Sequence, residues 1–251
     1  MHDGLSPRVQ GGDQGIAAAP GACHRTAGPA PEKGCIVSEK TVSLQVDGKI
    51  LKAREGDVLL KACLENDIYI PNLCYQEGID PLPVSCRLCF VEIEGREQPV
   101  PSCSIWVQEG MVVQTDTPRV RRLQRTGLKL LLSTHHVDCK NCPANRKCAL
   151  QDMARFLKIG LKSKTAYLKE PAVRSEHPHL DYYVNRCVLC GRCVEICRTR
   201  QQHPELTFIK RGFETVIGFY GRNPAEAASD WETYRACVEA CPVAALVLKN
   251  G

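Results

Sequence analysis

The chain has 251 residues, of which 43% are hydrophobic and only 6% aromatic, and its formal net charge is +5. This length allows one large domain or two to three small ones. No apolar run is long enough to span a bilayer, and no charged segment followed by an apolar core opens the chain, so we expect neither membrane insertion nor a secretory leader. Sixteen cysteines in tight clusters indicate metal ligands in a reducing compartment, the cytoplasm, rather than a disulfide scaffold.

The first 39 residues are rich in Gly, Ala and Pro and have almost no bulky apolar side chains. Such a composition cannot bury enough apolar surface to fold, so residues 1–39 are predicted to be a disordered tail. Cys23 and Cys35 lie in this tail and are interpreted as free thiols without a role.

A regular pattern begins at Thr41, where apolar and polar residues alternate around Asp47-Gly48, and it predicts a β-hairpin. The following stretch, residues 58–68, has helical spacing with Cys63 on its apolar side. Because a free cysteine packs as a small hydrophobic residue, we expect Cys63 in the core and not among the ligands.

The first chemical motif is a Cys-x2-Cys pair with one more distant cysteine on each side. A folded loop can direct four thiolates spaced in this way at one small iron-sulfur cluster. A structural zinc site is the alternative, although zinc sites usually use two such pairs and only one is present. Strands are expected around the motif at FVEIEG and MVVQTDT. The four cysteines are Cys74, Cys86, Cys89 and Cys103.

The second motif consists of two adjacent histidines followed by Cys139, Cys142 and Cys148. One imidazole in place of a thiolate changes the charge of a bound cluster and therefore its reduction potential. Spacing alone makes His135 and His136 nearly equal candidates for this ligand. Apolar spacing predicts helices at RVRRLQRTGLKLLLS and ALQDMARFLKIG, so a small helical unit should hold the cluster.

The third motif, Cys-x2-Cys-x2-Cys-x3-Cys, is the front half of a bacterial ferredoxin sequence and comprises Cys187, Cys190, Cys193 and Cys197. In two-cluster ferredoxins, the fourth cysteine of each run binds the other cluster. The first cubane would then take Cys187, Cys190, Cys193 and the cysteine that precedes a proline, Cys241.

The second half of this ferredoxin pattern is incomplete. Counting back from Cys241 with the same spacing gives Cys237, but then Tyr234 and Trp231 in place of cysteines. With only Cys197 and Cys237 left, we predict a degenerate site in which the two rings fill the volume of the missing cluster and the two thiols stay close together. The alternative is an ordinary helical pair of aromatic residues at positions i and i+3.

Several of these segments resemble one known family. PNLCYQEG and SCRLCFVEIEG resemble the plant-type [2Fe-2S] ferredoxin domain at the front of the largest peripheral subunit of respiratory complex I. The spacing His-x3-Cys-x2-Cys-x5-Cys together with CALQDMA resembles the His-ligated [4Fe-4S] segment of the same subunit, and this resemblance selects His135 over His136. Over residues 40–249, the chain resembles the diaphorase small subunit of NAD-reducing hydrogenases, which is similar to that part of complex I.

The resemblance implies an α+β fold with one [2Fe-2S] cluster and two [4Fe-4S] clusters. A β-grasp [2Fe-2S] ferredoxin domain (40–118) would be followed by a small helical [4Fe-4S] domain (119–160), whose ligands are one histidine and three cysteines. After a linker (161–181), a C-terminal bacterial-ferredoxin-like [4Fe-4S] domain (182–249) would contain one degenerate cluster site. The hydrogenase relatives usually carry two cubanes in this last domain, so the host complex stays open.

The family passes electrons between a flavoprotein NAD(P)H-binding subunit and a catalytic subunit of hydrogenase, formate dehydrogenase, acyl-CoA reductase or complex I type. We therefore expect a non-catalytic electron-transfer subunit of a hetero-oligomeric oxidoreductase. The chain has no P-loop and no G-x-G-x-x-G after a predicted strand, so the sequence gives no support for a nucleotide site of its own. The alternatives are a zinc-stabilised interaction or regulatory protein and a stand-alone ferredoxin-like carrier.

Positive charge is concentrated in the middle of the chain, where residues 119–174 contain 14 Lys or Arg but only three acidic residues. This excess predicts a docking face for an acidic partner subunit, and part of it balances the thiolates of the clusters. A nucleic-acid surface is the rival interpretation. We expect no nucleic-acid binding, because aromatic residues do not interleave with the basic ones.

Overall fold

The computed structural model describes residues 40–80, 82–162, 167–201, 204–220 and 231–249. The stretch expected to be a disordered tail, with Cys23 and Cys35, lies outside these residues. The described residues all belong to one compact unit, which spans residues 38–251. Within the described ranges, none of the helices combines the length and the apolar character that crossing a bilayer requires.

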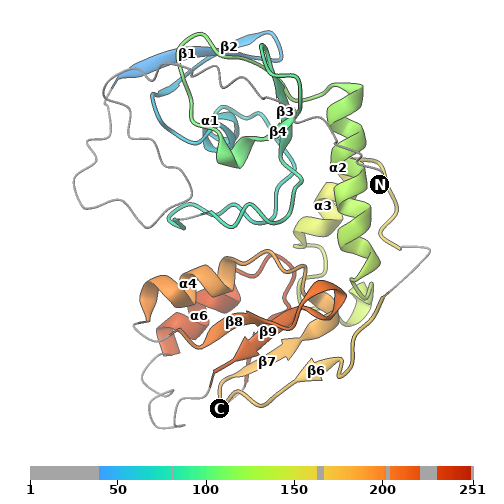
Figure 1. Cartoon of the computed structure of the whole chain (residues 1–251). Coiled ribbons are helices and arrows are strands. Elements are labelled where there is room, and N and C mark those ends of the chain that lie inside the picture. Colours follow the sequence, from blue (N-terminus) through green and yellow to red (C-terminus); the bar gives the residue numbers. More distant parts are fainter. Residues whose placement is uncertain (1–39, 81, 163–166, 202–203, 221–230, 250–251) are drawn as a thin grey trace, which may run out of the picture. The chain divides into compact units, whose positions relative to one another are not determined.

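A mixed five-stranded sheet in the order β2-β1-β5-β3-β4 forms the first region (Figure 1). Its strands are β1 (Thr41–Val46), β2 (Lys49–Arg54), β3 (Phe90–Ile93), β4 (Val100–Pro101) and β5 (Val112–Gln114). β1 and β5 pair in parallel, whereas the other pairs are antiparallel. The predicted hairpin turn is present: Asp47 and Gly48 both have positive φ, 49° and 82°, which a two-residue turn between twisted strands needs.

Alternate residues of β1 face the core of this region, as the sequence pattern predicts. They pack in one cluster with Leu59, Leu60 and Cys63 of α1 (Leu59–Glu65), which lies beside the hairpin in Figure 1. Cys63 is fully buried, and burial raises the pKa of its thiol to about 12. It is a core residue, as expected.

Two helices follow, α2 (Pro118–Ser133) and α3 (Ala149–Phe156). Thr117 starts α2, because its hydroxyl accepts a hydrogen bond from the backbone N–H of Val120 at 3.1 Å and a proline occupies the first turn. The helix expected to run to Gly160 stops earlier, because Lys158 adopts a left-handed conformation with φ of 53°.

Among its described residues, the C-terminal region contains two small sheets and two helices. The sheets are β10-β7-β6 and β8-β9, and the helices α4 and α6 pack against each other (Figure 1). The bounds are β6 (Val173–Arg174), β7 (Leu180–Tyr183), α4 (Arg192–Arg200), β8 (Leu206–Ile209), β9 (Val216–Phe219), α6 (Trp231–Glu239) and β10 (Leu246–Leu248), with 3-10 turns η3 (Val184–Arg186) and η4 (Gly212–Glu214). β6 and the start of β7 fall within the stretch expected to be a linker; they are strands because β7 completes a sheet with β10, more than 60 residues later.

Buried apolar residues of the helical and C-terminal regions form one continuous core. Leu128 of α2 and Met153 of α3 belong to the same cluster as Tyr182 of β7 and Ile196 of α4. Two short helices offer too little apolar surface for a core of their own, so the helical region is stabilised by the C-terminal one.

Candidate metal centres

The four cysteines of the first motif, Cys74, Cys86, Cys89 and Cys103, converge beside the five-stranded sheet. Cys74 and Cys86 lie in the long connection between α1 and β3, Cys89 directly precedes β3, and Cys103 lies in the short turn η1 (Ser102–Ser104). All four are buried, and the Sγ atoms of Cys74 and Cys86 are 3.4 Å apart. The fold thus gathers one spaced pair and two distant cysteines at one place.

Contacts among these four thiols shift their pKa values in opposite directions. Hydrogen bonds from Cys103 lower the pKa of Cys74 and Cys89, and the same contacts raise the pKa of Cys103 itself. The hydrogen bond to Cys74 likewise raises the pKa of Cys86. Buried thiols in contact with one another cannot all ionise unless a cationic group neutralises them, so the four sulfurs suit a metal cluster.

The second set of residues surrounds a cavity beyond the end of α2. His135, Cys139, Cys142 and Cys148 line this cavity together with the exposed His136. Cys139 belongs to η2 (Cys139–Asn141), and Cys148 is the residue that precedes α3. The three thiols and at least one imidazole therefore face a common space.

His135 is better suited than His136 to bind a metal. Its Nδ1 lies 3.0 Å from the backbone carbonyl of Arg186, and because a carbonyl only accepts, Nδ1 carries the proton and Nε2 has a free lone pair. Burial lowers the pKa of His135, which keeps the ring neutral. A carbonyl behind a neutral imidazole is the usual support of a metal-bound histidine.

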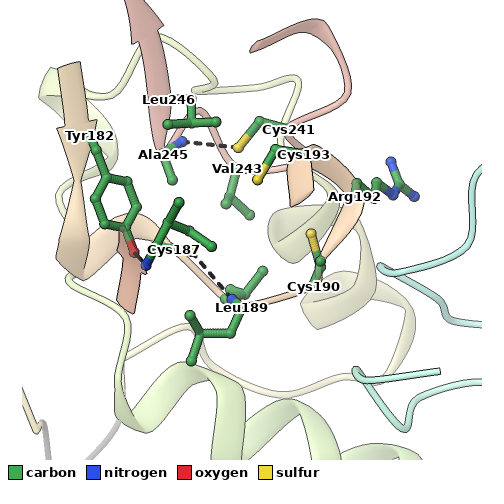
Figure 2. A pocket seen from close by; sticks show the side chains of 13 residues that line it. Tyr182, Cys187, Leu189, Cys190, Arg192, Cys193, Cys241, Val243, Ala245 and Leu246 are labelled. Atoms are coloured by element: carbon green, nitrogen blue, oxygen red, sulfur yellow. Dashed lines mark hydrogen bonds between the residues drawn. The ribbon is translucent and has the colours of Figure 1, made fainter. Parts of the chain in front are cut away.

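The third set forms a cavity between α4 and the strands of the C-terminal region. Cys187, Cys190, Cys193 and Cys241 line it, and Figure 2 shows the sulfur atoms of the last three turned toward one space. Burial raises the pKa of Cys187 to about 11 and that of Cys190 to about 12. As at the first site, a cation is needed to hold these sulfurs as thiolates.

Donors around the third set point at its sulfur atoms. The backbone N–H of Leu189 donates to Sγ of Cys187 at 3.4 Å, and that of Ala245 donates to Sγ of Cys241 at 3.2 Å (Figure 2). The buried hydroxyl of Tyr182 also interacts with Cys187 and opposes the rise of its pKa. Hydrogen bonds to sulfur favour the thiolate and raise the potential of a bound cluster.

Each of the three ligand loops contains a residue other than glycine in the left-handed region. These are Arg87 with φ of 54°, Arg146 with φ of 68° and Leu189 with φ of 51°. Such conformations cost about 1–2 kcal/mol each and persist at functional sites where the surroundings enforce them. The strain is consistent with loops shaped around a ligand.

Cys197 and Cys237 lie together between α4 and α6, as the degenerate-site prediction requires. Both are fully buried, and burial, with a contribution from Cys197, raises the pKa of Cys237 to about 12. Tyr234 is fully buried beside them, but Trp231 is 39% exposed, contrary to expectation. Trp231 is the first residue of α6, and only Trp231 and the next residue, Glu232, are exposed in its first turn, whereas Thr233 and Tyr234 are buried. Of the two aromatic side chains, Tyr234 is therefore buried in the interior, whereas Trp231 is partly exposed.

Two residues outside every sequence motif, His177 and Glu205, join Tyr234 in a buried polar cluster at this place. The Tyr234 hydroxyl donates to Oε2 of Glu205 at 2.6 Å, and Nε2 of His177 lies 3.3 Å from the same oxygen. The rings of His177 and Tyr234 meet edge to face at 4.8 Å. His177 and Glu205 precede strands in polar segments that read as ordinary loops, so no sequence signal marked them.

Three family models match consecutive parts of the chain. They are the 2Fe-2S iron-sulfur cluster binding domain (39–118), the NADH-ubiquinone oxidoreductase-G iron-sulfur binding region (124–161) and the ferredoxin-like domain of NADH-quinone oxidoreductase subunit 3 (177–247). In these three stretches the chain matches the N-terminal iron-sulfur part of the NADH-quinone oxidoreductase subunit. The expected α+β fold class and the expected resemblance are confirmed, as is the binding of 2Fe-2S and 4Fe-4S clusters as a property of these domains.

Curated relatives carry this region within longer proteins. NADPH-Fe(3+) oxidoreductase subunit alpha of Geobacter sulfurreducens is 31% identical over 83% of the chain, and NADP-reducing hydrogenase subunit HndD of Solidesulfovibrio fructosivorans is 34% identical over 82%. The chain spans only 24% and 36% of these two relatives. A solved structure, the NAD+-reducing [NiFe]-hydrogenase in the H2-reduced state, matches with a TM-score of 0.72 and 28% identity over 84% of this chain and 88% of that one.

Proposed function

We propose that the chain is a non-catalytic electron-transfer subunit of a multi-subunit, NAD(P)-linked oxidoreductase. The observation that carries the proposal is that three separate sets of sulfur and imidazole donors each surround one site within a single compact unit. A bound iron-sulfur cluster supplies one-electron transfer at each site. Several sites in one chain suit a relay better than a single structural zinc site does.

The proposed ligands follow from the donor sets. The cysteines of the first motif, Cys74, Cys86, Cys89 and Cys103, would hold one [2Fe-2S] cluster. Two [4Fe-4S] clusters would be held by His135, Cys139, Cys142 and Cys148 and by Cys187, Cys190, Cys193 and Cys241. The degenerate site would hold none, since a buried tyrosine and a carboxyl group occupy the place next to its two thiols.

Two partners are proposed: a flavoprotein that binds NAD(P)H and a catalytic subunit that receives or supplies the electrons. The names of the relatives, which include NADPH, NADP and NAD+, support the first. The excess of basic residues between 119 and 174 supports docking to an acidic subunit. The reduced thiols of the described cysteines suit the cytoplasm.

The test is an assay of iron, acid-labile sulfide and zinc on anaerobically purified protein. One [2Fe-2S] and two [4Fe-4S] clusters correspond to about ten irons per chain. About fourteen irons would contradict the degenerate site, and zinc without iron would overturn the electron-transfer function. NAD(P)H should bleach the visible absorption of the protein only when a flavoprotein subunit is present; bleaching of the isolated chain would show that it binds the nucleotide itself.

A further inference from the structure

The loops that form the first and third sites are joined directly by a hydrogen bond. Ser85 directly precedes Cys86 of the first site, and its Oγ donates to the backbone carbonyl of Cys190 of the third site at 2.9 Å. The two cysteines are more than 100 residues apart in the sequence. The Ser85 side chain thus links the backbone beside the proposed ligand Cys86 to the backbone of the proposed ligand Cys190.

Arg192 makes the reciprocal connection. It lies between Cys190 and Cys193, and its Nη2 donates to the backbone carbonyl of Tyr75, the residue after Cys74. Its Nη1 lies 3.5 Å from the carbonyl of Ala240, the residue before Cys241. The guanidinium group therefore spans from the first ligand loop to both ends of the third ligand set.

Close backbone packing accompanies these hydrogen bonds. Gly191 adopts φ of +85°, and a Cβ atom built there would lie 3.1 Å from Cβ of Pro83. Nη2 of Arg198 also reaches the carbonyl of Asp80 at 3.4 Å. The segment before Cys86 is therefore held at contact distance from both the start and the last turn of α4.

We propose that Ser85 and Arg192 are positioning residues that set the separation and the relative orientation of the first and third sites. The inference rests on the proposed function, in which both sites hold clusters. Electron transfer slows steeply with distance, and each of these side chains bonds to a carbonyl on a cysteine or next to one, so a loosened contact shifts a sulfur ligand. Arg192 adds a permanent positive charge between the two sites, which favours the reduced, more negative form of each cluster.

Two substitutions distinguish the positive charge of Arg192 from its hydrogen bonds. Arg192→Lys keeps the charge but loses the planar fork that reaches two carbonyls, whereas Arg192→Met loses both. Ser85→Ala removes the hydroxyl, and Ser85→Thr retains it as a matched control. A hydrogen bond of ordinary strength shifts the equilibrium between joined and separated loops about fivefold, so Ser85→Ala combined with Arg192→Met gives the largest effect.

The experiment uses the full chain, purified anaerobically and reduced, with iron content measured for every variant. Pulsed electron paramagnetic resonance reports the magnetic coupling between the two clusters, and a redox titration reports their potentials. We expect weaker and broader coupling in the double variant, wild-type coupling in Ser85→Thr, and lowered potentials in Arg192→Met but not in Arg192→Lys.

The outcomes separate this inference from the function on which it rests. Wild-type protein without iron would overturn the proposed function. Wild-type iron content in all variants, with coupling and potentials unchanged in the double variant, would overturn the positioning role alone. Equal loss of coupling in Ser85→Thr and Ser85→Ala would also contradict it, because the hydroxyl would then not matter.

Discussion

Replacing Tyr234 by Phe tests the polar network at the proposed degenerate cluster site. The variant removes only the hydroxyl that donates to Glu205 at 2.6 Å and keeps the buried ring. Both side chains are almost completely buried, so water cannot replace the lost donor. A hydrogen bond to a carboxylate contributes about 1.5–3 kcal/mol, and we expect the free energy of unfolding to fall by this amount.

The assay is anaerobic urea unfolding of the cluster-loaded protein, followed by circular dichroism. With a urea dependence of about 2 kcal/mol per molar, the midpoint should fall by roughly 0.7–1.5 M. Tyr220→Phe is the matched control, because the Tyr220 side chain is 64% exposed and the change should stay within about 0.5 kcal/mol. Equal midpoints for the two variants would refute the claim that the network stabilises this site.

Three further predictions concern the ligands, a buried histidine and a tight backbone contact. Cys197→Ala should leave the iron content unchanged, whereas Cys190→Ala should remove about four irons per chain. Burial holds the pKa of His177 below its ordinary 6.5, so as the pH falls below 6.5 the unfolded chain takes up a proton that the folded chain does not. The free energy of unfolding should therefore decrease below that pH, and His177→Gln should make the decrease shallower in urea titrations at several pH values; an unchanged slope would contradict this. Gly191→Ala should lower the urea midpoint more than Gly110→Ala, because both residues have positive φ but only the Cβ added at Gly191 would lie 3.1 Å from Cβ of Pro83, while that at Gly110 would meet no atom within 4 Å; equal losses would show that the contact is not tight.

At the proposed degenerate site, groups of the protein would take the place of a missing cluster. Cys197 and Cys237 stay at the positions that the ferredoxin pattern assigns to them, but their sulfurs bond to other groups of the protein. Sγ of Cys197 donates to the Gln201 side chain at 2.8 Å, and Sγ of Cys237 donates to the backbone of Cys193 at 3.4 Å. Sγ of Cys197 also accepts hydrogen bonds from the backbone N–H groups of Glu205 at 3.3 Å and Leu206 at 3.4 Å, so polar groups of the protein itself satisfy both sulfurs.

Local patterns were sufficient for the parts of the fold and the sites that depend on neighbours in the chain. Alternation around Asp47-Gly48 predicted the hairpin, and helical spacing placed Cys63 in the core. Each Cys-x2-Cys pair lies on one short loop, so its spacing alone brings two sulfurs together. The ferredoxin pattern also placed Cys197 beside Cys237, since it encodes the pairing of two helices.

Contacts outside these motifs could not be predicted, because the spacing within a motif carries no information about which other segments it meets. The burial of Tyr234 but not Trp231, and its hydrogen bond to Glu205 29 residues away, depend on how α6 lies against the strands. The shared core of the helical and C-terminal regions arises because neither buries enough apolar surface alone. The bond from Ser85 to Cys190 likewise exists only because tertiary packing brings two ligand loops into contact across 105 residues.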